Sequence, residues 1–243
     1  TIDSTNTEAK RQAMAGAPEG LVVLAEEQTG GRGRLGRSFQ SPRGCGLYLT
    51  ALLRPQLPPI EVVDFTAWVA VAVCDGIQAA CGVRPRIKWT NDIVLGGRKL
   101  CGILTELGLE GESNALDYLI TGIGVNVNQR TEDFLPEVRP IAVSLAQELG
   151  RPVRRAELAV EIIRALDRMY AGFPDNKAEY LARYRADCLT PGNQVQLITP
   201  VSREEAFALE IDDQFRLVVE YPDGRRAALS AGEVSVRGMY GYV

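Results

Sequence analysis

The amino-acid sequence predicts an α/β (α+β) fold in which a mixed β-sheet with flanking helices precedes a small barrel-like β domain. Apolar runs of strand length alternate with helical patterns as far as residue 190. After Pro191-Gly192 the pattern changes to short apolar runs separated by polar turns. The chain has 243 residues, 46% of them hydrophobic and 24% charged, which is typical of a folded globular protein. We therefore expect one domain over residues 1–190 and a second over residues 191–243.

Caps, chain breakers and apolar runs define the first elements. The polar residues 4–6 followed by Glu8 predict a helix that begins there and ends before Gly16. Apolar runs predict buried strands over residues 21–25 and 47–53, with a polar, glycine-rich loop between them. The long apolar segment over residues 60–81 predicts a buried helix.

Turn residues and apolar spacing define the elements that follow. The Gly96-Gly97 pair between apolar runs predicts a hairpin over residues 93–107. Apolar residues recur at helical spacing over residues 156–173, which predicts an amphipathic helix whose stripe is explained by core packing. By the same criteria, strands are expected at residues 86–89, 116–127, 195–198, 206–211, 215–220 and 227–236, and helices at residues 144–149 and 176–186.

Composition excludes several classes of site. The sequence contains no histidine, so catalytic triads that use this base cannot form. The formal net charge of −4 and the pI of about 5.2 argue against sequence-independent nucleic-acid binding. The five cysteines are odd in number and lack CxxC spacing, which favours a reducing cytoplasm. No apolar run approaches the ~20 residues of a membrane span.

The most informative segment is the loop over residues 28–37, QTGGRGRLGR. Glycines let a backbone approach a ligand closely, and backbone N–H groups with arginine side chains bind phosphate and carboxylate. The alternative is a flexible surface loop with solvated arginines. The segment is not a Walker A motif, because no Gly-Lys-Ser/Thr follows. It also does not open a helix, which weakens a dinucleotide-binding interpretation.

Three further segments carry candidate site residues. Asn91-Asp92 follows a strand and can orient a nucleotide or bind Mg²⁺, although a plain polar turn is the alternative. Lys99 opens an apolar strand, so its ammonium group can neutralise a phosphate or an oxyanion; the alternative is a solvated lysine beside a turn. Gly122 and Gly124 in a strand either admit a ligand closely or mark a bulge.

Taken in chain order, these motifs resemble those of the biotin–protein ligase family. The resemblance covers essentially the whole chain and is to the monofunctional type, without the DNA-binding N-terminal domain of bifunctional members. One departure is Thr90, where the family usually has proline. The resemblance implies a class II synthetase/biotin-ligase-like catalytic domain and an SH3-like β-barrel C-terminal domain. The matching runs are residues 4–6 (STN), 31–37 (GRGRLGR), 88–92 (KWTND), 98–104 (RKLCGIL) and 122–126 (GIGVN).

The resemblance also implies roles for the matched residues. Lys99, Arg34 and Asp92 would be catalytic, and Asp92 would also be the ligand of Mg²⁺. The implied biotin-binding residues are Ser4, Thr5, Asn6, Gln28, Arg32, Gly33, Arg34, Lys99 and Gly102. The implied ATP- or adenylate-binding residues are Arg32, Arg34, Arg37, Phe39, Lys88, Asn91, Asp92 and Asn126.

The implied activity is that of a cytoplasmic, ATP-dependent and AMP-forming biotin–protein ligase. Biotin and ATP would give biotinyl-5′-AMP, with Mg²⁺ as cofactor. Biotin would then pass to a lysine of the biotin carboxyl carrier protein of acetyl-CoA carboxylase. The carboxylate that attacks ATP needs no deprotonation at neutral pH, so the lack of histidine is no obstacle. No nucleic acid or membrane partner is expected, and the oligomeric state, including a homodimer, is left open.

Three alternatives remain. A lipoate or octanoate–protein ligase-like acyltransferase resembles this family in fold, although its loop motif differs and typically includes a histidine. A non-catalytic nucleic-acid-binding module could use the arginine-rich loop, but that loop lacks interleaved aromatic residues. A ligand-binding but inactive paralogue is the third alternative, although the GRGR residues and Lys99 are all present.

Overall fold

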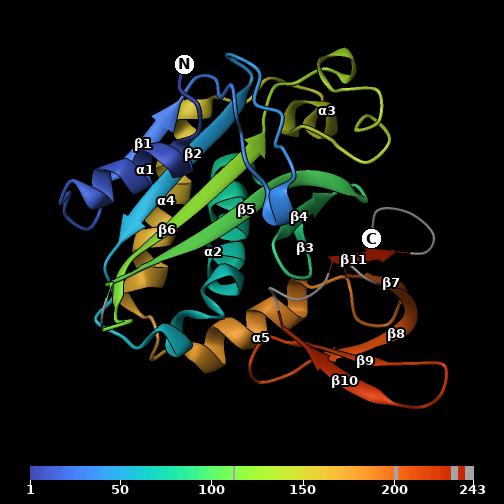
Figure 1. The fold of residues 1–243 in the computed structure, drawn as a ribbon. Helices are drawn as coiled ribbons and strands as arrows, with labels where there is room; N and C mark the ends of the chain where they lie inside the picture. The colour runs from blue at the N-terminus through green and yellow to red at the C-terminus, as the bar shows by residue number, and fades with distance from the viewer. Residues whose placement is uncertain (112, 200–201, 231–234, 239–243) are drawn as a thin grey trace.

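A six-stranded sheet forms the centre of the larger part of the molecule, and a five-stranded sheet lies beside it (Figure 1). The structure, a computed structural model, describes residues 1–111, 113–199, 202–230 and 235–238. The larger sheet has the strand order β1-β2-β6-β5-β4-β3. Its strands are β1 (Val22–Ala25), β2 (Gly46–Leu53), β3 (Arg86–Lys88), β4 (Asp92–Leu95), β5 (Arg98–Leu109) and β6 (Leu116–Asn126).

The larger sheet is antiparallel. All pairings between its six strands are antiparallel. Short turns explain much of this, because β4 and β5 form the predicted hairpin, with Gly96 and Gly97 both at positive φ. Parallel pairing in the described residues is confined to isolated bridges, Ile2 with Gln28, Ile87 with Cys188 and Lys99 with Ala142. The predicted fold class is confirmed, with mixed strand direction limited to these bridges.

The helices lie on both faces of the larger sheet. Those in the described residues are α1 (Thr5–Met14), α2 (Phe65–Cys81), α3 (Leu145–Leu149), α4 (Arg155–Ala171) and α5 (Lys177–Asp187). Figure 1 shows α2 and α4 together behind the sheet, while α1 lies near β1 and β2. α2 and α4 cross closely at Gly76, where a Cβ atom would come 2.7 Å from the Cα of Ile162. The close crossing therefore requires glycine at this position of α2.

Alternation along the strands separates the two faces of the larger sheet. Leu119 and Ile123 of β6 belong to the main core, which also contains the buried residues of α2 and α4. Tyr118 and Ile120 instead pack in a second cluster with Ala9 of α1. The strand positions that follow on this second face are Gly122, Gly124 and Asn126. Gly122 lies against Asn6 in the first turn of α1, whereas Gly124 lies against Phe39, which follows the glycine-rich loop. The site described below is built on this part of the face, which the hydrophobic cluster under α1 leaves uncovered.

The C-terminal sheet packs onto the larger part through a continuous core. Its strands are β7 (Gln194–Ile198), β8 (Arg203–Ile211), β9 (Leu217–Glu220), β10 (Arg226–Leu229) and β11 (Ser235–Gly238). Their order is β10-β9-β8-β7-β11, and every pairing is antiparallel. The indole nitrogen of Trp89 donates to the carbonyl of Phe215 at 2.9 Å, and Tyr184 of α5 packs edge-on against the Phe215 ring. The boundary at residues 190/191 stays a prediction.

Three predicted elements differ from the structure. The buried strand expected over residues 21–25 is present as β1, but none of its residues is buried and Leu24 is 53% exposed, because β1 lies at the edge of the sheet. A single strand over residues 227–236 is wrong, because β10 pairs with β9 at one edge of the sheet and β11 pairs with β7 at the other. Residues 231–234 of that range lie outside the described residues. The helix expected over residues 60–81 is divided into a 3-10 helix, η2 (Pro59–Val62), and α2. Asp64 at the start of α2 has non-helical backbone angles, and its carboxylate pairs with Lys177 at 2.9 Å.

The remaining predicted strands and helices are present with boundaries shifted by a few residues. In the described part of the chain, no helix combines the length and apolar character needed to cross a bilayer.

Candidate functional site

A cavity of about 800 Å³ opens where the glycine-rich loop lies over the uncovered part of the larger sheet. All the residues that the sequence predicted for the site line it, although they come from segments far apart in the chain. These residues are Ser4, Thr5, Asn6, Gln28, Arg32, Gly33, Arg34, Arg37, Phe39, Lys88, Asn91, Asp92, Lys99, Gly102 and Asn126.

Glycines on β5 and β6 make the floor of the cavity. Gly102 and Gly124 are paired across the two strands, so both lie on the same face. A Cβ at Gly124 would lie 2.6 Å from Cε1 of Phe39, and one at Gly122 would lie 1.9 Å from Oδ1 of Asn6. The floor is therefore already in contact with two predicted site residues, and larger side chains there would displace both.

Hydrogen-bonding side chains gather where α1 begins. The amide of Gln28 accepts through Oε1 from the backbone N–H of Thr5 (2.8 Å) and from its hydroxyl (3.0 Å). Its Nε2 donates to the hydroxyl of Ser41 at 2.7 Å. Ser4 is the N-cap residue of α1, yet its hydroxyl does not cap the helix. Thr5 is thus held in one orientation by a residue 23 positions away.

Asn6 is held by the strands beneath it. Its Nδ2 donates to the carbonyl of Leu104 (3.1 Å) and to Oε2 of Glu106 (2.9 Å), and its Oδ1 accepts from Thr50 (2.7 Å). The carboxylate of Glu106 also forms an ion pair with Arg32 of the glycine-rich loop. Nη1 of Arg32 donates to Oε2 at 3.1 Å, and Nη2 lies 2.9 Å from Oε1. Glu106 was not among the predicted site residues.

The glycine-rich loop has a defined fold. Gly33 N–H donates to the carbonyl of Arg37 (2.7 Å), and Phe39 N–H donates to that of Gly31 (2.9 Å). Between them lies a 3-10 turn, η1 (Arg34–Gly36), which the sequence did not predict. A Cβ at Gly31 would lie 2.3 Å from the carbonyl oxygen of Phe39, so the two arms of the loop can meet only with glycine there.

Arg34 links the loop to the turn between β3 and β4. Its Nη1 donates to Oδ1 of Asn91 at 3.0 Å, and Asn91 in turn donates to the carbonyl of Ile103 at 2.8 Å. Burial lowers the pKa of Arg34, because its guanidinium lies away from bulk water. The side chain remains charged at neutral pH, since arginine does not deprotonate in this range.

Lys99 and Asp92 form an ion pair in the cavity, with 2.7 Å between Nζ and Oδ1. Their meeting depends on a register shift between β4 and β5, where Ile93 pairs with Cys101 but Val94 pairs with Lys99. Leu100 is the extra residue of this bulge. As a result, Lys99 lies on the same face as Gly102, where a Cβ would lie 3.4 Å from its Nζ.

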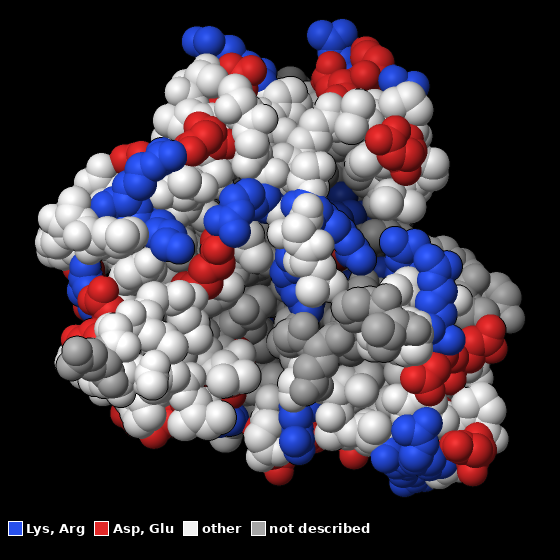
Figure 2. Space-filling view, in the orientation of Figure 1, with Lys and Arg blue, Asp and Glu red and all other residues white. Residues whose placement is uncertain are grey.

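Positive charge dominates the cavity. Figure 2 shows Lys and Arg side chains around a hollow near the middle of the face seen there. The cations that line it are Arg32, Arg34, Arg37, Lys88, Lys99 and Arg237. Lys88 is 6% exposed, and burial, the largest cause, together with the nearby cations lowers its pKa to about 8 despite the opposing effect of Asp92. Three carboxylates also line the cavity, those of Asp92, Asp133 and Glu137, so the six cations outnumber the anions. This surplus of positive charge favours an anionic ligand.

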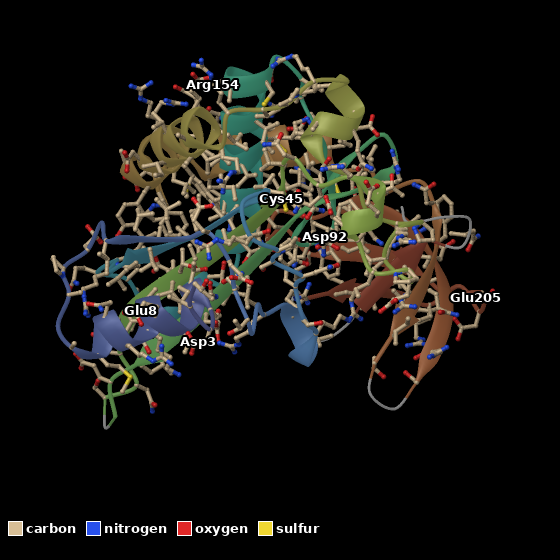
Figure 3. The ribbon with its side chains drawn as sticks, turned by 90° about the horizontal axis from the view of Figure 1, so that it is seen from above. Asp3, Glu8, Cys45, Asp92, Arg154 and Glu205 are labelled. Atoms are coloured by element: carbon tan, nitrogen blue, oxygen red, sulfur yellow. The ribbon has the colours of Figure 1, made fainter. Side chains whose placement is uncertain are left out.

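Two parts of the cavity wall were not predicted. Loop residues Asp133, Leu135 and Ile141 lie on one side, and Arg237 of β11 lies on another. Gln40 ties the first part to the glycine-rich loop, donating to Asp133 O (2.9 Å) and accepting from Leu135 N–H (3.1 Å). Figure 3 shows Asp92 of β4 on the side of the larger sheet that is towards the C-terminal sheet. These contributions come from long-range contacts for which no local sequence signal exists.

Residues 1–126 match the model of the biotin/lipoate A/B protein ligase family, which is more than half of the chain. The chain belongs to this family. A biotin–[acetyl-CoA-carboxylase] ligase of Paracoccus denitrificans is 33% identical over 246 residues, covering 97% of this chain and 98% of the relative. The bifunctional ligase/repressor BirA of Bacillus spizizenii is 36% identical over 231 residues, covering 95% of this chain and 70% of the relative.

A solved structure of the family is similar over nearly the whole length. The biotin protein ligase from Aquifex aeolicus in complex with biotin and ATP has a TM-score of 0.82 and 26% identity, with 98% of this chain and 96% of that chain covered. The agreement extends through the C-terminal sheet, so both sheets belong to the architecture of this family. The peptide bond between Trp89 and Thr90 is cis.

Proposed function

We propose that the chain is an ATP-dependent biotin–protein ligase that forms biotinyl-5′-AMP and transfers biotin to a carrier-protein lysine. The observation that carries the proposal is one cavity in which oriented hydrogen-bonding groups adjoin a cluster of cations. Relatives named biotin–[acetyl-CoA-carboxylase] ligase support the same activity. The biotin carboxyl carrier protein of acetyl-CoA carboxylase is accordingly the acceptor we propose.

The residues at the start of α1 suit the ring system of biotin. The hydroxyl of Thr5 donates its one hydrogen to Gln28, so its lone pairs are left to accept. The ureido ring of biotin carries two N–H donors and one carbonyl, and such acceptors complement the donors. Asn6 donates to Leu104 and Glu106, so only its oxygen has capacity left for biotin. We therefore assign ring recognition mainly to Ser4 and Thr5, with Gln28 orienting Thr5.

The cations suit the first chemical step. A carboxylate oxygen of biotin attacks the α-phosphorus of ATP, the bond to the bridging oxygen breaks, and pyrophosphate leaves. The main obstacle is repulsion between the carboxylate of biotin and the negatively charged phosphates of ATP. Fixed cations reduce this repulsion, and they do so most effectively in a site that excludes water. Lys99 lies beside the glycine floor, and Arg34 enters from the opposite loop. We propose that these two side chains stabilise the charge that develops at the α-phosphate.

The chain can contribute little to holding Mg²⁺ by itself. Within the described ranges, no three His, Cys, Asp or Glu side chains are grouped so as to hold a metal ion. Mg²⁺ is commonly held by one or two carboxylates together with substrate phosphates. Asp92, beside Asn91, fits this mode as the single carboxylate, and the metal would neutralise phosphate charge. Asp92 already pairs with Lys99, so we propose that Mg²⁺ enters with ATP.

The second step transfers the acyl group. The neutral amine of the acceptor lysine attacks the acyl carbon of biotinyl-5′-AMP, and AMP leaves with the bonding electrons. The lysine side chain loses one proton to become this neutral amine, and the amine loses a second proton as the amide bond forms. Asp92 is the carboxylate we propose to accept a proton or to orient the amine. The cytoplasm is the location we propose, since all five cysteines are free thiols.

The small molecule that the protein activates distinguishes a biotin ligase from a lipoate ligase. The protein is incubated with ATP, Mg²⁺ and either biotin or lipoate, and the retained adenylate is identified by mass spectrometry. We expect biotinyl-5′-AMP with biotin and no acyl-adenylate with lipoate. A lipoyl adenylate alone would support the acyltransferase alternative, and no adenylate with either acid would refute ligase activity. A titration with DNA at low salt tests the remaining alternative, for which we expect no binding.

A further inference from the structure

Glu106 lies outside the cavity lining but contacts two of the residues that line it. Its two carboxylate oxygens pair with two guanidinium nitrogens of Arg32, at 2.9 and 3.1 Å. The oxygen Oε2 also accepts a hydrogen bond from Asn6 at 2.9 Å. The three residues come from different parts of the chain, since Arg32 lies 74 positions and Asn6 100 positions from Glu106. Glu106 therefore connects α1, the glycine-rich loop and β5 at one point.

We infer that Glu106 is a positioning residue for this site, one that holds the first arm of the glycine-rich loop against β5 so that Arg32 faces biotin. Arg32 has five N–H donors in a planar fork, and a two-point contact with a carboxylate fixes the plane of that fork. The identity of the ligand in this inference rests on the proposed function, whereas the placement of the loop does not.

Most exposed ion pairs stabilise a fold weakly, by about 0–1 kcal/mol. This pair differs in two respects. Its carboxylate is 26% exposed and shares an oxygen with the buried Asn6 amide. Asn6 is itself fixed by Thr50 and by the close approach of Gly122. The carboxylate thus has a rigid support. Through Arg32 it holds the first arm of the glycine-rich loop to β5, a contact that the backbone hydrogen bonds within the loop do not supply.

The sign of the effect distinguishes positioning from simple electrostatics. Glu106 is an anion near a cavity proposed to bind anions, so its charge alone disfavours biotin. If charge were its only influence, Glu106→Gln would tighten the binding of biotin. If it positions Arg32, the same substitution weakens binding, because glutamine cannot make the two-point ionic contact. Glutamine keeps an oxygen that can accept from Asn6, so the substitution is aimed at the contact with Arg32.

The test measures biotin binding by calorimetry for the wild type, Glu106→Gln, Arg32→Ala and the double variant. We expect Glu106→Gln to raise the Kd about tenfold, within the range for charge-assisted hydrogen bonds. When Arg32 is already replaced by alanine, Glu106→Gln should raise the Kd less than about twofold, because the partner of Glu106 is absent. Glu110→Gln, at an exposed position just beyond β5, is the matched control and should leave the Kd unchanged.

A second arm needs no ligand. Trypsin cleavage within the loop, followed by mass spectrometry, should be several-fold faster in Glu106→Gln than in the wild type or Glu110→Gln, at equal thermal unfolding midpoints. Any one of three results overturns the inference. Glu106→Gln could bind biotin as tightly as the wild type or more tightly, it could have the same effect with and without Arg32, or it could leave the rate of loop cleavage unchanged. Failure of the wild type to bind biotin refutes the proposed function instead, and the cleavage arm still tests the positioning role.

Discussion

The buried ammonium group of Lys88 allows a quantitative prediction. Its pKa is lowered from the ordinary value of 10.5 to about 8, mainly by burial. At about 1.36 kcal/mol per pH unit, the charged form costs the folded state about 3 kcal/mol. Lys88→Met removes the charge and keeps a flexible apolar side chain of similar length. We expect this variant to be more stable than the wild type at pH 7 and slower in adenylate formation.

The pH dependence of that stability difference follows from linkage. The unfolded chain binds the Lys88 proton up to a higher pH than the folded chain, so the wild type gains stability as the pH rises from about 8 to 10.5. Between pH 7 and pH 9.5 the advantage of Lys88→Met should shrink by about 2 kcal/mol. For a chain of this size, that corresponds to roughly 4–8 °C in the difference between the two unfolding midpoints.

Thermal unfolding of both proteins at pH 7 and pH 9.5 measures this change. Lys10→Met, at an exposed position of α1, is the control and should show the same difference from the wild type at both pH values. A stability difference for Lys88→Met that does not vary with pH would falsify the burial argument. A variant with full adenylation rate would show that the charge of Lys88 does not serve the reaction.

Three further predictions concern the cavity. Lys99→Ala should slow adenylate formation about 10²–10³-fold in single-turnover assays while the unfolding midpoint changes little, and a near-normal rate would remove Lys99 from the catalytic residues. Gly124→Ala should raise the KM for biotin at least about tenfold, because the new Cβ would lie 2.6 Å from the Phe39 ring. The control is Gly111→Ala, because a Cβ at Gly111 would meet open space. Equal KM values for Gly124→Ala and Gly111→Ala would refute the steric argument. Biotin should slow tryptic cleavage within residues 30–37, because binding orders the loop, and equal cleavage rates with and without biotin would contradict this.

The helices and most strands were predictable because their signals are local. The apolar stripe of α4 and the glycine pair of the β4–β5 hairpin each lie within a short window of sequence. The errors arose where local signals are ambiguous. Apolar residues lie on both sides of residues 231–234, among them Leu229 and Val236. The sequence therefore could not separate β10 from β11, which pair with strands at opposite edges of the sheet.

The predicted site residues rested on resemblance to family motifs, and the structure brings all of them to one cavity. Composition alone left each motif with an ordinary alternative, such as a solvated loop or a polar turn. The resemblance could not indicate Glu106 or the loop that holds Asp133, because their roles depend on contacts between distant segments.

The sequence by itself determined the chemistry that is available: no histidine, a glycine-rich loop with arginines, and a lysine at the start of a strand. Only the tertiary structure decided where these groups point. Strict alternation would place Lys99 and Gly102 on opposite faces of β5, since they are three residues apart. The extra residue Leu100 reverses that parity and turns the Lys99 ammonium toward Asp92 and the glycine floor. A bulge of this kind depends on pairing between strands, and that pairing exists only once the chain has folded.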